Sequence, residues 1–246
     1  MIHQNKGFMI RQTNYSESSK IITVLSEHGA LVPLMARGFN KPRSPFNSLK
    51  QGYKHTLFTY SRHRGMGTLT EIDIIDGYNT INNDFDTYTI ASYIVELISR
   101  VTDEEIADPS LYRLMHQAFK LLDENNEKYS VLSFVIIKLF PMYGALLNVD
   151  KCVLCGSYSY ENMNRYSFKY HGVICNDHYD EEHLERSVYV SSRSIYLAAF
   201  LKHVQVEHLN SINIGEEDGK KLFKFVDMLF QEYTGEFFKT RKLLQI

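Results

Sequence analysis

The sequence predicts an α+β protein in which a small β-barrel precedes an α-helical domain with an inserted metal-binding module. Three observations carry this prediction. Short apolar runs separated by turn residues fill residues 1–80, helical periodicity dominates residues 81–246, and all three cysteines fall within residues 149–182. Alternation with period two is typical of strands, and apolar residues at three- and four-residue spacing are typical of helices.

Residues 1–80 show the pattern of short strands. Apolar runs cover Gly7–Ile10, Lys20–Leu25 and Ala30–Ala36, and period-two alternation covers Lys54–Tyr60 and Thr68–Ile75. Several short strands separated by turn signals favour a small closed barrel over a sandwich. We therefore expect one barrel domain over residues 1–80.

Residues 81–246 show mainly helical periodicity. Apolar residues recur every three or four positions from Ile90 to Val101, and Pro109 suits the first turn of the next helix. The nearly all-apolar segment Ser130–Phe140 is expected to form a buried central helix. Helical patterns return over Ser191–His203 and Asp218–Leu244.

The most specific local signal is a set of four metal-ligand residues in the segment 149–182. Cys152 and Cys155 form one C-x-x-C pair, and Cys175 and His178 form a second pair after 19 intervening residues. This spacing is typical of zinc ribbons, whose paired ligands face one ion. Four such donors leave no open coordination position, which indicates one structural Zn²⁺ per chain.

Two alternatives remain open for this segment. His171 and His183 lie near enough in the sequence to replace His178 as the fourth ligand. In the other alternative, the cysteines are small core residues and His178 is a surface histidine without a metal.

The charge of the chain is unevenly distributed. Residues 1–70 contain ten Lys and Arg but two Asp and Glu, a net charge of +8, whereas residues 71–246 carry −10; no acidic residue occurs from His28 to Thr70. Residues 1–70 thus form a basic head and residues 71–246 an acidic body. This arrangement predicts a polyanion partner for the basic head. Seven cations of the acid-free stretch are the expected DNA contacts: Arg37, Lys41, Arg43, Lys50, Lys54, Arg62 and Arg64.

Aromatic residues are interleaved with these cations, namely Phe39, Phe46, Tyr53, Phe58 and Tyr60. Cations that follow a phosphate backbone beside rings that stack on bases allow a small barrel to hold single strands. The alternative is a solubilising basic face with the rings in the core, and we expect Phe58 to be a core residue.

Composition and motifs exclude several classes of protein. No apolar run approaches the roughly 20 residues needed to span a bilayer, and the N-terminus lacks the features of a signal peptide. Three cysteines are too few for a disulfide framework, so we expect a cytoplasmic protein with reduced thiols. The sequence has no P-loop, nucleophile elbow or H-E-x-x-H motif, so we do not expect an enzyme.

Segments in a fixed order along the chain carry a resemblance to a known family. They are Gly7–Arg11, Tyr15–Ile21, Glu27–Gly29, Ala36–Gly38, Tyr93–Leu97, Phe134–Gly144, Cys152–Gly156 and Ser167–Cys175. In this order they resemble the opening strands, first long helix, central helix and two zinc-module halves of the RecO family of bacterial DNA repair and recombination mediators. The resemblance runs over nearly the whole chain.

The resemblance implies an N-terminal OB-fold barrel and a helical domain with an inserted zinc module. It also implies a nucleoid-associated protein of the RecF pathway that binds single- and double-stranded DNA and anneals complementary strands. Together with RecR, such a protein helps RecA to replace single-strand-binding protein. Many members carry four cysteines, whereas position 178 is His in this chain.

By the same resemblance, the acidic body is expected to bind the C-terminal tail of single-strand-binding protein. This acidic tail ends in Phe, so it needs an apolar pocket and a cation for its carboxylate. The C-terminal helix offers Lys220, Lys221 and Lys224 beside Phe223. The alternative is that these lysines only solvate the end of the helix.

Two other functions remain open at this stage. A zinc-stabilised protein-interaction adaptor would bind nucleic acid only secondarily, and a nuclease or ligase fragment would need an active site that no motif reveals. A strong salt dependence of DNA binding separates the mediator from the adaptor. Turnover of a nucleic-acid substrate would support the enzyme.

Overall fold

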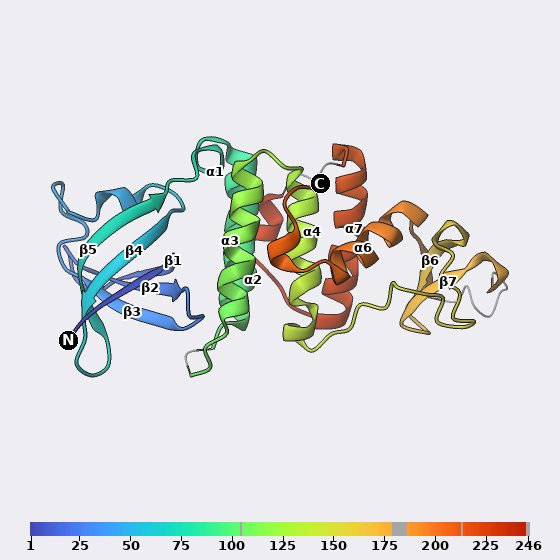
Figure 1. The fold of residues 1–246 in the computed structure, drawn as a ribbon, viewed down its shortest axis with the longest axis horizontal. Helices are drawn as coiled ribbons and strands as arrows, with labels where there is room; N and C mark the ends of the chain where they lie inside the picture. Colours follow the sequence, from blue (N-terminus) through green and yellow to red (C-terminus); the bar gives the residue numbers. More distant parts are fainter. Residues whose placement is uncertain (104, 179–185, 213, 245–246) are drawn as a thin grey trace. The chain divides into compact units, whose positions relative to one another are not determined.

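The computed structural model describes residues 1–103, 105–178, 186–212 and 214–244 (Figure 1). The chain forms two compact units: one comprises Met1–Asn125 with Thr240–Leu244, and the other comprises Asn126–Lys239. Strands followed by helices confirm the predicted α+β class. The compact units divide the chain after Asn125, and the predicted domain boundaries at residues 80 and 149–182 stay predictions.

Five strands of the first unit form a closed barrel in the order β1-β2-β3-β5-β4 (Figure 1). They are β1 (Ile2–Asn14), β2 (Lys20–Ser26), β3 (Leu31–Ala36), β4 (His55–Ser61) and β5 (Gly67–Asp76). Neighbouring strands are antiparallel except for β3 and β5, and β1 closes the barrel by pairing with β4. A five-stranded barrel of this kind has the OB architecture, so the barrel prediction is confirmed.

Strand β1 is long and irregular enough to pair with two neighbours. Residues Ile2–Phe8 pair with β4 and Gly7–Asn14 pair with β2, with a register shift between Met9 and Arg11. Such a bulge increases the local twist and lets the strand turn a corner of the barrel. At Gly7, where the two pairings overlap, a Cβ would lie 2.5 Å from the Leu25 carbonyl oxygen, so a side chain cannot be accommodated.

The connection between β3 and β4 fills the barrel core with apolar side chains. Phe39, Phe46 and Leu49 are each at most 3% exposed and belong to the same cluster as Phe58 of β4. Leu49 lies on a short helix, η1 (Asn47–Lys50). The rings of this connection therefore contribute to the core of the barrel.

Helices α1 (Asn79–Asn83), α2 (Phe85–Val101) and α3 (Pro109–Asp123) complete most of the first unit. The side chains of Asp84 and Asp108 cap α2 and α3 by accepting backbone N–H groups, and Pro109 opens α3 as predicted. The short helix η6 (Thr240–Leu243) returns to α2, where the backbone nitrogen of Thr240 donates to Glu96 Oε2 at 3.0 Å.

The second unit is built on α4 (Lys128–Leu139), α6 (Ser192–His203) and α7 (Glu216–Thr234). Helix α4 is almost entirely buried, which confirms the predicted central helix. Helix α7 ends at Thr234 instead of continuing to Leu244 as predicted. Gly235 adopts a left-handed φ of 64° and caps the helix there, a role that glycine fills without steric cost.

A small sheet completes the second unit. Its strands β6 (Met163–Ser167), β7 (Gly172–Cys175) and β8 (Ser187–Tyr189) are antiparallel in the order β7-β6-β8. The hydroxyls of Tyr166 on β6 and Tyr233 on α7 lie 2.9 Å apart, and the Tyr166 ring also contacts Phe225 of α7. The buried side chain of Tyr166 therefore attaches the sheet to α7.

A buried aromatic cluster joins the barrel to α3 within the first unit. The rings of Phe8 and His55 stack with centroids 5.1 Å apart, and His55 Nε2 lies 2.7 Å from the Tyr112 hydroxyl. His116 lies edge-on to His55 at 5.0 Å. Burial, with a smaller contribution from His116, lowers the pKa of His55 to about 4, and burial also lowers the pKa of His116. The carboxylates of Asp76 and Glu27 oppose the shift at His55 only in part.

We expect the first unit to lose stability as the pH falls from about 6.5 towards about 4. Histidine in the unfolded chain binds a proton below its ordinary pKa of 6.5, whereas folded His55 resists protonation until a pKa of about 4, so protons favour unfolding across this window. The thermal unfolding midpoint should fall over this range. His55→Gln should reduce that pH dependence, and His28→Gln, at an exposed position, should not. An unchanged pH dependence in His55→Gln would contradict this explanation.

Candidate metal centre and basic barrel surface

The four predicted metal ligands come together at one end of the small sheet. Cys152 and Cys155 lie in the loop that precedes β6, Cys175 is the last residue of β7, and His178 ends the short helix η4 (Asn176–His178). Their ligand atoms all lie within 4.8 Å of one another. The fold therefore gathers the two sequence pairs at a single point that can hold a metal ion.

The distances between the donor atoms fit a tetrahedral site. Cys155 Sγ lies 3.7 Å from Cys175 Sγ, and His178 Nδ1 lies 3.8 Å from Cys152 Sγ and 3.2 Å from Cys175 Sγ. The corners of a tetrahedron with zinc–sulfur bonds of about 2.3 Å are about 3.8 Å apart. The donors thus already have the spacing that one central ion requires.

Backbone contacts hold the C-x-x-C turn against the sheet. The backbone nitrogen of Gly156 donates to the Cys152 carbonyl at 2.8 Å, and Gly156 has a φ of +78°, which glycine adopts freely. The nitrogen of Val153 donates to the Val173 carbonyl on β7 at 3.0 Å. At Gly172 a Cβ would lie 2.2 Å from the Val153 side chain, so glycine is needed for this close approach.

The electrostatics of the thiols favour a bound cation. Burial, together with the neighbouring thiols of Cys155 and Cys152, raises the pKa of Cys175 to about 12. At Cys152 burial acts in the same direction, but backbone N–H donors, including that of Cys175 at 3.4 Å, outweigh it and lower the pKa. Three thiolates this close repel one another without a positive charge between them, so metal binding must release thiol protons.

The structure distinguishes the candidates for the fourth donor. His178 Nδ1 lies among the sulfur atoms, whereas His171 Nδ1 lies 3.3 Å from the hydroxyl of Tyr233 on α7. His183 lies outside the described residues, as do the acidic residues 180–182. Among the histidines that the structure describes, His178 is the one in the cluster.

Five of the seven predicted DNA contacts lie on the β3–β4 connection; Lys54, its last residue, is half-buried, and the other four are exposed. The exposed four are Arg37, Lys41, Arg43 and Lys50. The ammonium of Lys50 donates to the Lys41 carbonyl at 3.1 Å and lies over the ring of Phe39. Within the described part of the chain, none of the four forms an ion pair with an acidic side chain. Positive charge is therefore concentrated here without local compensation.

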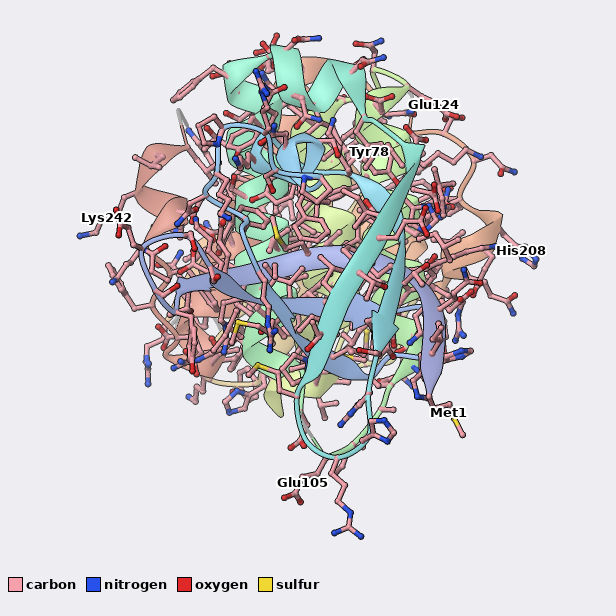
Figure 2. The ribbon with its side chains drawn as sticks, turned by 90° about the vertical axis from the view of Figure 1, so that its left-hand side faces the viewer. Met1, Tyr78, Glu105, Glu124, His208 and Lys242 are labelled. Atoms are coloured by element: carbon pink, nitrogen blue, oxygen red, sulfur yellow. The ribbon has the colours of Figure 1, made fainter. Side chains whose placement is uncertain are left out.

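The other three cations are divided between the two ends of β4. Arg62 and Arg64 occupy the β4–β5 turn, and Lys54 precedes β4 at its opposite end. Strand β4 has seven residues, a length of about 20 Å. Figure 2 shows the two ends well separated: Met1, whose carbonyl accepts from the Arg62 nitrogen, lies far from Tyr78, which follows the end of β5 beside the start of β4.

The prediction that aromatic rings on the barrel surface stack on bases is wrong. Phe39, Phe46, Phe58 and Tyr60 belong to the buried barrel core. Tyr53 is half-buried, and its hydroxyl donates to Ser92 Oγ at 3.0 Å. Large inward side chains are needed to fill a small barrel, and these rings serve that purpose. The β3–β4 connection presents charge to the solvent and keeps its two phenylalanine rings inside.

At the start of α7 the structure revises the predicted partner site. Phe223 is fully buried, so the expectation that it contacts a partner is wrong. Lys220 and Lys221 form ion pairs with Glu216 and Glu217 one turn earlier, at 2.7 and 2.6 Å. The lysines thus partly serve to pair charges along the exposed face of the helix.

A cavity of about 360 Å³ lies beside this segment. Its lining residues are Tyr189, Val190, Ser191, Ser194, Lys221, Lys224, Phe225 and Met228. Two of the predicted lysines, Lys221 and Lys224, therefore line the cavity. The aromatic residue that lines it is Phe225 and not the predicted Phe223. Sequence reasoning missed the residues from β8 and the start of α6 because they approach α7 only through the fold.

The fold and sites together define an OB-barrel protein with a basic surface and an appended Cys₃His module. Among the described residues, no helix is long and apolar enough to cross a membrane. The family model "Recombination protein O N terminal" matches residues 1–78, and "Recombination protein O C terminal" matches residues 82–242.

Curated relatives agree with these matches. The chain is 32% identical over 244 residues to the DNA repair protein RecO of Staphylococcus aureus strain MRSA252, across 99% of this chain and 97% of the relative. The same values hold for DNA repair protein RecO of strain N315. The chain therefore belongs to the RecO family of DNA repair proteins, a family of recombination mediators and not a known class of enzyme.

Proposed function

We propose that this chain is a recombination mediator of the RecF pathway. It binds single- and double-stranded DNA, anneals complementary strands and, with RecR, helps to load RecA onto DNA coated by single-strand-binding protein. It acts without catalysis in the cytoplasm, associated with the nucleoid and not with a membrane. The observation that carries the proposal is the uncompensated basic β3–β4 connection on the barrel of a RecO-family chain.

DNA binding by this surface rests on charge and not on base recognition. Arg37, Lys41, Arg43 and Lys50 are exposed, and phosphate groups are their natural partners. Because every strand carries the same phosphates, such contacts hold single or double strands regardless of sequence. Neutralising phosphates also lowers the repulsion between two complementary strands, which is the physical requirement for annealing.

Replacing Arg37, Lys41 and Arg43 together by Ala should flatten the salt dependence of DNA binding. If the barrel neutralises about four phosphates, log K against log salt has a slope near −3 for single strands, from about −0.7 per contact, and the triple variant should keep about −0.7. Fluorescence anisotropy of a labelled oligonucleotide measures this slope. Lys120→Ala, which removes an exposed helical cation, is the control. Equal affinity of the triple variant and the parent at low and moderate salt would exclude the β3–β4 connection as the DNA contact.

The alternative is a zinc-stabilised protein-interaction adaptor with only secondary nucleic-acid binding. The observation in its favour is the largely apolar cavity between β8, the start of α6 and α7. A parent chain whose DNA binding is weak and insensitive to salt would support the adaptor over the mediator.

The metal of the Cys₃His cluster is proposed to be one structural Zn²⁺ per chain, held by Cys152, Cys155, Cys175 and His178. Three thiolates and one imidazole are a preferred zinc donor set, and four protein donors leave no position for a catalytic water. Bound zinc contributes folding free energy to a module that is built on three short strands.

Protein purified without chelator should contain about one zinc per chain. His178→Ala should lower this occupancy more than the matched variant His171→Ala, because His171 contacts Tyr233 and not the sulfur atoms. Chelation should destabilise the second unit before the barrel. Metal analysis by atomic absorption measures occupancy. If His171→Ala lowers zinc occupancy more than His178→Ala does, the fourth ligand is misassigned. Far less than one zinc per chain in the parent, together with cysteine thiols that react quickly, would count against the site.

The cavity beside α7 is proposed to bind the C-terminal tail of single-strand-binding protein. Phe225 and Met228 offer an apolar wall for the terminal Phe of the tail, and Lys221 and Lys224 offer charge for its carboxylate. The acidic body repels an acidic peptide, and Lys221 already pairs with Glu217. These two costs limit the affinity of the tail. RecR is proposed as a further partner without an assigned surface.

A fluorescent tail peptide should bind the chain at micromolar strength and should lose affinity when its final Phe is removed. Lys221→Ala with Lys224→Ala should weaken binding about tenfold, because the carboxylate loses its charged partners. Lys220→Ala is the matched control, since its ammonium lies over the Tyr129 ring and does not line the cavity. If the barrel variant Arg37→Ala, Lys41→Ala and Arg43→Ala weakens peptide binding as much, the attraction is only charge on the barrel.

A further inference from the structure

A second cavity, of about 530 Å³, lies at the end of the small sheet opposite the metal cluster. Its lining residues are Phe168, Lys169, His171, Arg186, Glu232 and Tyr233. Three of them belong to the turn between β6 and β7, Arg186 directly precedes β8, and the last two lie in the final turns of α7. Strand β7 runs from this turn at Gly172 to the metal ligand Cys175, so the cavity and the cluster occupy opposite ends of one strand.

The walls of this cavity are fixed by backbone contacts. The nitrogen of Phe168 donates to the Arg186 carbonyl at 2.9 Å, and the nitrogen of Tyr170 donates to Ser167 Oγ at 3.3 Å. His171 and Arg186 have positive φ angles of 53° and 49°. Residues other than glycine adopt this conformation only where their surroundings hold them, and such residues gather at ligand sites.

The floor of the cavity carries a neutral hydroxyl network. The Tyr233 hydroxyl lies 2.9 Å from the Tyr166 hydroxyl and 3.3 Å from His171 Nδ1. Burial raises the pKa of Tyr233, so its hydroxyl stays protonated and can donate a hydrogen bond. This network holds the Tyr233 ring beside that of Phe168, with centroids 6.4 Å apart.

The charge of the lining favours an anion. Among the described lining residues, Lys169 and Arg186 carry positive charge and Glu232 is the one acidic residue. Arg186 Nη2 lies 3.6 Å from Glu232 Oε1, and both side chains are more than half exposed. Exposed ion pairs of this kind are weak, so a phosphate can compete for the guanidinium. Cations beside two aromatic rings match the two parts of a nucleotide.

We infer that this cavity is a second DNA-contact site, in which Lys169 and Arg186 bind a phosphate of a single strand and Phe168 and Tyr233 receive the base. The inference rests on the proposed DNA binding and deepens it. A chain with two such sites can hold two strands at once, which annealing requires. In the barrel the aromatic rings lie in the core. In this cavity, by contrast, the rings of Phe168 and Tyr233 line the wall beside cations.

Salt-dependent binding of a labelled single strand to the full chain tests this site with three variants. Lys169→Ala with Arg186→Ala should reduce the magnitude of the log K against log salt slope by about 0.7, since the one phosphate contact of the cavity is lost. Glu232→Gln should strengthen binding, because it releases Arg186 from its ion pair and removes the acidic side chain from the lining. Lys151→Ala removes an exposed cation that lies over the Tyr158 ring outside the cavity, and should leave the slope unchanged. Annealing of two complementary strands should slow in the double variant.

The outcomes separate this site from the barrel. An unchanged slope in the double variant, or weaker binding in Glu232→Gln, would overturn the second site. The barrel proposal would still stand if the triple variant Arg37→Ala, Lys41→Ala and Arg43→Ala weakens binding. If neither set of variants alters DNA binding, both proposals fail. A double variant that loses the acidic tail peptide but keeps its DNA affinity would make the cavity a protein site and overturn the inference. Parent-like circular dichroism and metal content establish that the variants are folded.

Discussion

The small sheet of the second unit depends on four donor atoms that lie within 4.8 Å of one another. Its three strands have five, four and three residues, which is short for a sheet that is stable by itself. A cation bound among these donors would offset the repulsion between thiolates and tie the C-x-x-C turn to β7. The other end of β7 leads into the turn that lines the larger cavity. The cluster and the cavity are therefore connected through a single strand.

Charge and aromatic rings are arranged differently in the barrel and in the second unit. In the barrel, Phe39 and Phe46 fill the core while the cations of the same connection face the solvent. Such a surface suits a phosphate backbone of any sequence. In the second unit, rings and cations line the same cavities. Those cavities suit ligands that combine a flat apolar group with negative charge, such as a nucleotide or a peptide ending in Phe.

Local signals in the sequence predicted the strands, most helices and the cluster, because each depends on short spacing. The C-x-x-C pair and the pair at 175 and 178 are examples, and so is Pro109 at the start of α3. The sequence could not show that the rings of the β3–β4 connection turn inward, since charge and burial alternate within a few residues. The sequence also could not predict that Phe225, and not Phe223, lines the cavity, or that Arg186 pairs with Glu232. Both contacts arise from tertiary packing.

The central claim is that three thiolates and the imidazole of His178 surround one metal ion. The absorption spectrum of the chain reconstituted with Co²⁺ tests it most directly, because tetrahedral and octahedral Co²⁺ differ strongly in the intensity of their visible bands. We expect intense visible bands and thiolate-to-cobalt charge transfer, with a changed band pattern in His178→Ala and an unchanged one in His171→Ala. Weak bands of six-coordinate Co²⁺, or a spectrum that Cys155→Ser does not alter, would contradict the claim.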